Sequence, residues 1–223
     1  MKRILALALA LLTVLSLCAC GGTDAQPEDE NAFLYKPWKS LFDGGGVVKF
    51  SEDGTVRIFD YAGTWEMNGE TLVVSYTDSD NRIRDVEFTI MDIGGETILY
   101  RKYTFYAAED RFDQGAEALK SYMLENAEEL DWKAAYNSFL KNETAAKEEY
   151  NGKIVRWNAT AFEIRDGYAY MANETYKGYP LSPVNVYLSK GDLSQMSRSG
   201  EYVVVGILVL GSYSHISSAF IVE

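Results

Sequence analysis

Few residues of this 223-residue chain have the type and spacing needed for catalysis or metal binding. The single histidine, His215, has no serine and aspartate arranged near it as a nucleophilic triad requires, so we interpret it as a structural or surface residue. Asp78, Asp80 and Asn81 alternate with calcium-loop spacing, but the glycine and glutamate that complete an EF-hand do not follow. That segment is better interpreted as a hairpin turn. We therefore expect no enzyme, no metal and no cofactor.

Five tyrosines between positions 168 and 187 indicate a binding surface instead. Tyr176 and Tyr179 lie in the sequence NETYKGYPLSP, whose glycine and prolines are typical of an exposed loop. They are the strongest candidates for ligand contacts, because exposed tyrosine rings can stack on bases or sugars. Tyr168, Tyr170 and Tyr187 are further candidates, and the alternative for them is a place in the core or on an ordinary sheet surface.

The first seventeen residues have the pattern of an export signal. Lys2 and Arg3 are followed by an apolar run from Ile4 to Leu17. As a helix these fourteen residues would reach about 21 Å, which is short of the roughly 30 Å hydrocarbon core. A cleaved signal is therefore expected rather than a membrane-spanning helix.

The segment Leu17-Cys18-Ala19-Cys20 resembles the bacterial lipobox. The resemblance implies that Leu17 and Ala19 form the cleavage motif and that Cys20 is acylated and becomes the first residue. It also implies a lipid-anchored protein on the extracytoplasmic face of the cell membrane. The alternatives are an ordinary secretory signal cleaved near Ala19, or modification of Cys18. Residues 1–19 would then be the signal peptide, and residues 20–32, with four acidic and no basic residues, an acidic tether.

Residues 33–106 alternate between apolar and polar residues with period two and are interrupted by turn pairs such as Asp53-Gly54 and Asn68-Gly69. This pattern predicts about six strands in an antiparallel meander that closes into a small barrel or sandwich. Six strands would be few for an open ligand cavity, because about eight are needed to hold one small ligand.

This segment resembles the lipocalin-like domains of bacterial lipoproteins, which share the motif F-x-x-D-G-T, then G-T-W, then N-G-x-x-L. The matching residues are Phe50, Asp53, Gly54, Thr55, Gly63, Thr64, Trp65, Asn68, Gly69 and Leu72. Trp65 would either form the floor of the barrel beneath an apolar ligand or pack in the core.

Residues 107–152 change to helical periodicity and form a helical link. We expect two helices, roughly 114–127 and 132–150, with Asp113 and Asp131 as N-caps and Asn151-Gly152 as the stop signal. The eleven acidic and five basic residues of this link are expected on a solvated face.

Residues 153–223 return to strand patterns. Five strands are predicted at Lys153–Ile164, Tyr168–Ala172, Val184–Leu188, Tyr202–Leu210 and Ser214–Val222. The small residues Ala159 and Ala161 in the first strand and Gly206 in the fourth favour a small closed barrel.

The entry to this segment resembles the tRNA-anticodon-like OB-fold domain of bacterial lipoproteins, with its motif N-x-x-A-A-x-x-x-Y-x-G-K. The matching residues are Asn142, Ala145, Ala146, Tyr150, Gly152 and Lys153, followed later by Gly200, Val203 and Val205. The resemblance implies a five-stranded OB-like barrel with an N-terminal helix from about residue 130. It does not imply tRNA binding, because OB folds host many ligands.

The expected fold is thus mainly β with a helical link: an antiparallel meander or small barrel, one or two helices, and a five-stranded OB-like barrel. The expected function is that of a lipid-anchored extracytoplasmic binding or adaptor protein, whose partners are the membrane and an envelope protein, a peptide or a glycan. The alternatives are a carrier of a small apolar ligand in the lipocalin-like domain, and an enzyme of unrecognised type. Nucleic acid is not expected as a partner. Although the chain has 33 acidic and 21 basic residues, residues 153–223 balance at six of each, so the expectation rests mainly on the missing basic patch and on the expected location outside the cytoplasm.

Overall fold

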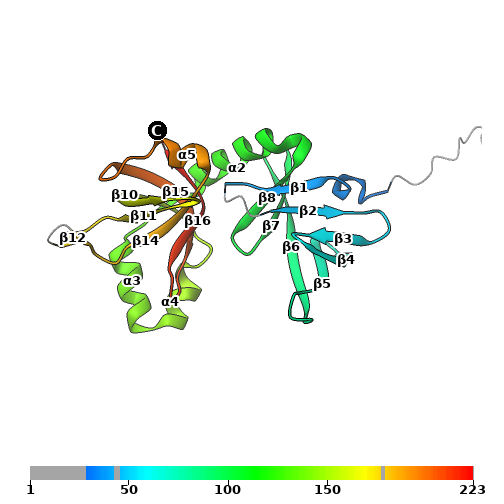
Figure 1. Cartoon of the computed structure of the whole chain (residues 1–223), viewed down its shortest axis with the longest axis horizontal. Coiled ribbons are helices and arrows are strands. Elements are labelled where there is room, and N and C mark those ends of the chain that lie inside the picture. The colour runs from blue at the N-terminus through cyan, green and yellow to red at the C-terminus, as the bar shows by residue number, and fades with distance from the viewer. Residues whose placement is uncertain (1–28, 43–45, 177–178, 223) are drawn as a thin grey trace, which may run out of the picture. The chain divides into compact units, whose positions relative to one another are not determined.

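The protein is mainly β, as the sequence predicts, and Figure 1 shows the order of its elements. The computed structural model describes residues 29–42, 46–176 and 179–222. A short 3-10 helix, η1 (Ala32–Leu34), precedes a barrel of eight strands, which is followed by helices and then by a barrel of five strands.

The first barrel is a closed antiparallel meander in which each strand pairs with the next along the chain. Its strands are β1 (Pro37–Ser40), β2 (Val47–Phe50), β3 (Thr55–Ile58), β4 (Tyr61–Asn68), β5 (Thr71–Thr77), β6 (Ile83–Ile93), β7 (Glu96–Arg101) and β8 (Thr104–Ala108). Trp38 of β1 pairs with Ala108 of β8, and this pairing closes the barrel.

The expectation of about six strands is wrong for two local reasons. Strand β1 has the sequence PWKS, in which Trp38 is the one large apolar residue, so it shows no apolar alternation. The segment from Thr97 to Tyr106, expected as one strand, reverses direction at Lys102 and Tyr103, whose φ angles are 43° and 71°. Because non-glycine residues seldom adopt positive φ, this turn carries no recognisable sequence signal.

Aromatic side chains fill the interior of the first barrel. Trp38, Phe50, Phe88 and Tyr106 are all at most 2% exposed. The Phe88 ring contacts Phe50 and Tyr106 edge to face, with centroids 6.3 and 5.6 Å apart. Trp65 lies beside this group, half-buried, with its ring centroid 5.9 Å from that of Phe50. These contacts agree with the interpretation of Trp65 as a core-packing residue.

The helical link contains three α-helices. They are α2 (Phe112–Asn126), which follows the 3-10 turn η2 (Glu109–Arg111), α3 (Trp132–Lys141) and α4 (Glu143–Tyr150). Asp131 caps α3 as predicted, because its Oδ1 accepts a hydrogen bond of 2.9 Å from the Ala134 N–H. Asp113 is not an N-cap, since α2 begins one residue earlier and places Asp113 inside its first turn.

The expected helix 132–150 is interrupted at Asn142. This residue has φ −154° and ψ 95°, so it is extended and ends α3. Its side-chain oxygen then accepts a hydrogen bond of 3.2 Å from the Ala145 N–H and caps α4. Asparagine favours such a position because its short side chain competes with the helix for backbone donors. The helix stops at Asn151-Gly152 as predicted, with Gly152 at φ 85°.

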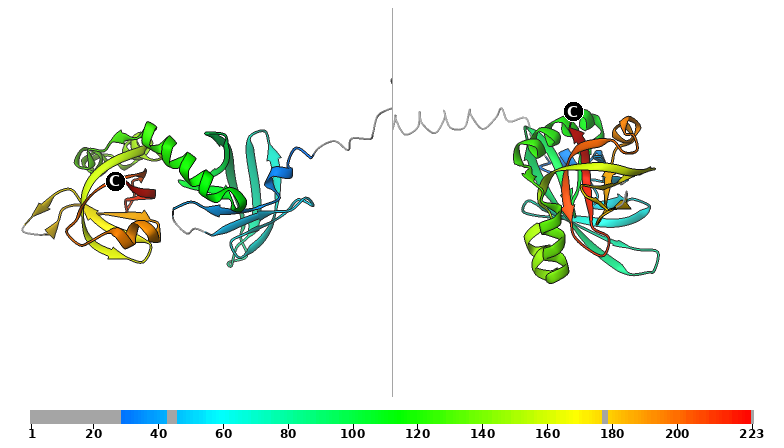
Figure 2. Two further views of the ribbon diagram at one scale, coloured as in Figure 1. Left: turned by 90° about the horizontal axis from the view of Figure 1, so that it is seen from above. Right: turned by 90° about the vertical axis from the view of Figure 1, so that its left-hand side faces the viewer.

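The second barrel closes in the order β10, β11, β14, β16, β15 and back to β10, with β14 and β16 parallel. Its strands agree with the five predicted ones. They are β10 (Ile154–Arg165), β11 (Tyr168–Ala172), β14 (Val184–Leu188), β15 (Glu201–Val209) and β16 (His215–Val222). The accessory elements are β9 (Glu128–Glu129), the pair β12 (Thr175–Tyr176) and β13 (Tyr179–Pro180), and helix α5 (Lys190–Gln195). Figure 2 shows the long curved course of β10, coloured yellow-green.

Strand β15 is buried on both faces, which explains its nearly continuous apolar sequence. Val204 and Leu208 lie in the core of the second barrel. Val205 and Ile207 pack on the opposite side, in a cluster that includes α2. The ladder between β15 and β16 is irregular between Val205 and Ile207, at the predicted glycine kink.

Candidate binding surface on the second barrel

The tyrosines of β11 and β14 lie on the outer face of the barrel. The alternating residues Ala169, Met171, Val184 and Val186 are fully buried in its core. Their neighbours are half-buried and paired across the strands, Tyr168 with Tyr187 and Tyr170 with Asn185, and Asn185 pairs in turn with His215 of β16. We call the outward-facing set of Tyr168, Tyr170, Tyr187 and His215 the tyrosine face.

Three rings of the tyrosine face form a row. The centroids of Tyr168 and Tyr187 are 5.7 Å apart, and His215 meets Tyr187 edge to face at 5.4 Å. His215 Nδ1 also lies 3.1 Å from the carbonyl oxygen of Tyr213. The row is therefore held in place by its own contacts, and its outer side remains accessible to a partner.

An ion pair ends this row. The guanidinium of Arg165 lies over the Tyr168 ring at 5.9 Å and donates a hydrogen bond of 3.1 Å to the Tyr168 hydroxyl. Its Nε and Nη2 donate to the two carboxylate oxygens of Glu163 at 2.9 and 3.1 Å. These hydrogen bonds lower the pKa of Glu163 and, with the Tyr168 contact, raise that of Arg165. The two charges offset each other, so the row ends without a net charge.

Tyr176 and Tyr179 lie on a separate hairpin. The two positions are paired in the register of the short β12–β13 ladder, which is closed at its base by a hydrogen bond of 2.9 Å from the Leu181 N–H to the Glu174 carbonyl. Tyr179 is 75% exposed, as the sequence predicts, whereas the side chain of Tyr176 is outside the described residues. Within the described residues, no ring contact joins Tyr179 to the tyrosine face.

A groove of about 300 Å³ begins at Tyr170 and Asn185 and lies between α3, the start of β14 and the β15–β16 loop. We call it the α3 groove. Its lining residues are Trp132, Tyr136, Phe139, Tyr170, Ser182, Pro183, Asn185, Gly211, Ser212, Tyr213 and Ser214. Trp132 and Tyr136 stack with centroids 5.5 Å apart, and Trp132 Nε1 donates to the Ser182 carbonyl at 2.7 Å.

Sequence reasoning did not identify most of this groove. Trp132 and Tyr136 lie in the predicted helix 132–150, where their spacing is that of an ordinary apolar stripe and does not indicate a binding site. The one available signal is the position of Tyr213 directly after Gly211-Ser212, a turn pair whose composition is typical of an exposed loop. Tyr213 is 86% exposed.

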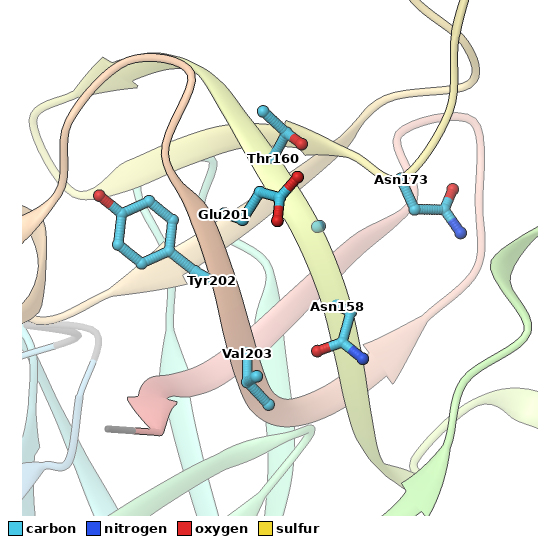
Figure 3. Close-up of a pocket in the computed structure, with 7 residues that line it drawn as sticks. Asn158, Thr160, Asn173, Glu201, Tyr202 and Val203 are labelled. Atoms are coloured by element: carbon cyan, nitrogen blue, oxygen red, sulfur yellow. The ribbon is translucent and has the colours of Figure 1, made fainter.

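A second hollow, of about 360 Å³, lies on the outer side of β10 and β15 (Figure 3). Asn158, Thr160 and Glu201 line it, whereas the Tyr202 ring points away from these side chains. Its hydroxyl accepts a hydrogen bond of 2.6 Å from the Ser197 N–H. Glu201 is the one carboxylic acid among the described residues that line this hollow, and the lining contains no histidine, lysine or second carboxylate with which it could form an acid–base pair.

The Asp78 segment forms a hairpin turn, as the sequence predicts. Asp78 Oδ1 accepts from the N–H groups of Asp80 and Arg82 at 2.9 and 3.0 Å, and Oδ2 accepts from Arg84 Nε at 2.7 Å. Both carboxylate oxygens of Asp78 thus accept hydrogen bonds from residues of the same turn. No cluster of three or more histidine, cysteine, aspartate or glutamate side chains that could hold a metal occurs in the part of the chain that the structure describes.

We expect the Asp78→Asn variant to lose stability at neutral pH but not in acid. The hydrogen bonds from Arg82 N–H and from Arg84 lower the pKa of Asp78. A carboxyl whose pKa is lower in the folded state stabilises the fold above its unfolded pKa of about 3.9, and this contribution disappears as the pH falls through the folded pKa. Urea unfolding at pH 7 and pH 2.5 measures the difference between wild type and variant.

The matched control for this experiment is Asp80→Asn, because Asp80 enters the turn through its backbone N–H rather than its carboxylate. Its unfolding free energy is expected to differ little from the wild type at both pH values. An Asp78→Asn deficit that is equally large at pH 2.5 would contradict the assignment.

The lipobox residues Leu17, Ala19 and Cys20 lie outside the described residues. Among the described helices, none has the length and apolar character that crossing a bilayer requires. Comparisons of the chain with family models, with curated proteins and with solved structures find no match. The function is therefore inferred from the residues and their geometry.

Proposed function

We propose that this protein is a lipid-anchored extracytoplasmic binding module without enzymatic activity, and that its tyrosine face contacts an envelope protein, a peptide or a glycan. The lipobox-like sequence that ends at Cys20 supports the anchor, and the acidic residues 20–32 would act as a spacer between the lipid and the first barrel. Two or more acyl chains on one cysteine provide stable membrane attachment, whereas a single chain does not.

The observation that carries the binding role is the row of outward rings on β11, β14 and β16. Tyr168, Tyr187 and His215 contact one another on the side of the sheet opposite to the barrel core. Tyrosines are enriched at binding surfaces because a rigid ring supplies a large contact area and its hydroxyl supplies a hydrogen bond. These rings are not part of the barrel core, because β11 and β14 contribute Ala169, Met171, Val184 and Val186 to it from their other face.

The alternative of a small-ligand carrier depends on free space in the first barrel. Eight strands are enough to enclose a small ligand, but here Trp38, Phe50, Phe88 and Tyr106 occupy the interior. This filling favours a structural role for the first barrel. Native mass spectrometry of the purified protein separates the two functions, because a carrier would retain a stoichiometric lipid. An enzyme of unrecognised type is disfavoured because the described linings of the α3 groove and of the hollow on β10 and β15 hold no paired acid and base groups. In the hollow that adjoins the α3 groove, Lys133 and Glu174 form an ion pair with each other at 3.2 Å.

We expect the detergent-solubilised full-length protein to sediment with detergent-washed cell walls of its own bacterium. Detergent removes any contribution from the lipid anchor, so sedimentation reports on the folded part. Tyr187 is the central ring of the row, and Tyr187→Ser should reduce the bound fraction at least tenfold, as expected for the loss of a central aromatic contact. The bound fraction is measured by immunoblotting of pellet and supernatant.

The control is Tyr61→Ser in the first barrel, where Tyr61 also contacts a neighbouring tyrosine, Tyr76, with ring centroids 5.3 Å apart. This variant is expected to sediment like the wild type. The proposal fails if the wild-type protein remains in the supernatant, or if Tyr187→Ser sediments as well as the wild type.

A further inference from the structure

The α3 groove is lined by neutral residues. Its described lining consists of aromatic rings, serines, one asparagine, one proline and one glycine, with no lysine, arginine, aspartate or glutamate. In the adjoining hollow of about 380 Å³, the charged residues Lys133 and Glu174 pair with each other at 3.2 Å. A phosphate or carboxylate ligand would find no unpaired cation in these linings, so the groove suits an uncharged ligand.

Several polar groups in the groove are available to a ligand. The side-chain amide of Asn185, the Ser212 hydroxyl and the Tyr213 hydroxyl make no hydrogen bond to another described residue. They can donate and accept, and they lie among aromatic rings. Aromatic rings beside neutral hydrogen-bonding groups complement a sugar. The C–H faces of a sugar stack on aromatic rings, and its hydroxyls need hydrogen-bond donors and acceptors.

The loop that carries Tyr213 is organised before any ligand binds. Ser214 Oγ accepts from the Gly211 N–H at 3.2 Å and donates to the Gly211 carbonyl at 3.1 Å. The Leu210 N–H donates to Asn151 Oδ1 at 2.6 Å, which ties the start of the loop to the end of α4. A solvent-exposed ring on such a loop costs little ordering entropy when it binds.

The strands beside the groove leave no edge for a peptide. β11 pairs with β10 and β14, and β14 pairs with β11 and β16, so both strands have two neighbours. A peptide that binds by strand addition needs a free edge with unpaired backbone groups. The walls of the α3 groove instead consist of side chains from a helix, two paired strands and a loop.

We propose that the α3 groove binds a neutral oligosaccharide, with Tyr213 and Tyr136 as stacking platforms and Asn185 as a hydrogen-bonding group. The groove and the adjoining hollow share Trp132, Tyr136 and Ser182, so the two are contiguous and together offer room for more than one sugar unit. This inference rests on the proposed binding function of the second barrel and names the chemical class of its ligand.

Isothermal titration calorimetry tests the proposal on the full-length protein in detergent. The probes are chitohexaose, cellohexaose and maltohexaose, each at millimolar concentration. At least one of them should bind with an affinity that is the same in 50 and 500 mM NaCl, since no charge is involved. Tyr213→Ala should weaken binding about tenfold or more, the effect of losing one stacked ring. Because Tyr213 is exposed, this variant is expected to fold like the wild type.

Tyr61→Ala in the first barrel is the control and should leave the affinity unchanged. Failure of all three hexaoses to bind, retention of binding in Tyr213→Ala, or loss of binding at 500 mM NaCl would each overturn the proposal. The result of this titration can be distinguished from the result of the cell-wall sedimentation experiment that tests the proposed function. Wall binding that depends on Tyr187 without oligosaccharide binding refutes only the ligand class, whereas oligosaccharide binding without wall association refutes only the envelope role.

Discussion

We expect Gly206→Ala to lower the free energy of unfolding of the protein by about 3 kcal/mol, the upper part of the usual range for overpacking a core. Gly206 lies on β15 where the strand faces the core of the second barrel. A Cβ atom added there would overlap Ile216 Cγ2, and it would lie 2.8 Å from Ala219 Cβ and 3.0 Å from the Ser217 carbonyl oxygen. Ile216 and Ala219 are themselves fully buried and cannot move into solvent.

Gly191→Ala provides a matched control for this substitution. Gly191 lies in helix α5, and the nearest atom to an added Cβ is Ser189 Oγ at 3.5 Å, which is ordinary contact. Alanine is the better helix former, so the unfolding free energy should be unchanged or raised by up to about 1 kcal/mol. Urea unfolding followed by tryptophan fluorescence measures both variants. Equal stability of Gly206→Ala and wild type would show that the barrel is not packed tightly at this position.

The second large effect is expected at Cys20. If the lipobox resemblance holds, Cys20→Ala removes the acylated residue and the protein should move from the detergent phase to the aqueous phase on partitioning. Each buried methylene contributes about 0.8 kcal/mol, so two or more acyl chains account for essentially all of the membrane affinity. Metabolic labelling with a fatty acid gives an independent measurement, and the label should be absent from the variant.

Cys18→Ala is the control that separates the alternatives for this region. Position 18 lies between Leu17 and Ala19, where the lipobox is permissive, so its substitution should leave labelling and partitioning unchanged. Loss of the label in Cys18→Ala, with retention in Cys20→Ala, would assign the modification to Cys18. Detergent-phase partitioning of both single variants, without any label, would refute the lipoprotein assignment.

The second barrel could be predicted closely from sequence because its signals are local. Its five strands are bounded by turn residues such as Asp166-Gly167, and small residues mark the places where strands bend or approach. Gly206 is such a small residue. Its position in the fourth strand predicted a bend, whereas its close approach to Ile216 and Ala219 is seen only in the folded structure.

The first barrel and the link were predicted less completely. The turn at Lys102 and Tyr103 and the helix break at Asn142 both depend on particular backbone conformations. These residue types can adopt those conformations, but their presence in the sequence does not predict them. Short strands such as β1 are stabilised by their partners β2 and β8, and this pairing is not encoded in four residues. For these elements tertiary contacts outweigh local propensity.

The candidate site shows the same division. Tyr168 and Tyr170 alternate along one predicted strand and Tyr187 lies on the next, so the sequence could group them, but it favoured a place in the core or on an ordinary sheet surface over a binding role. The α3 groove could not be anticipated, because Tyr136, Tyr170 and Tyr213 come from positions far apart in the chain.

The sequence by itself determined the mainly β class, the order of the two β segments and the helical link, and the absence of recognisable catalytic spacing. These properties follow from hydrophobic period, turn residues and short-range motifs, all of which act over a few residues. Only the tertiary structure decided that the first barrel has eight strands with a filled interior, that the tyrosine row faces outward, and that a helix, a sheet and a loop form one uncharged groove. Such properties depend on which residues that are distant in the sequence pack together. That packing is determined by the contacts of the whole folded chain and not by any short segment of it.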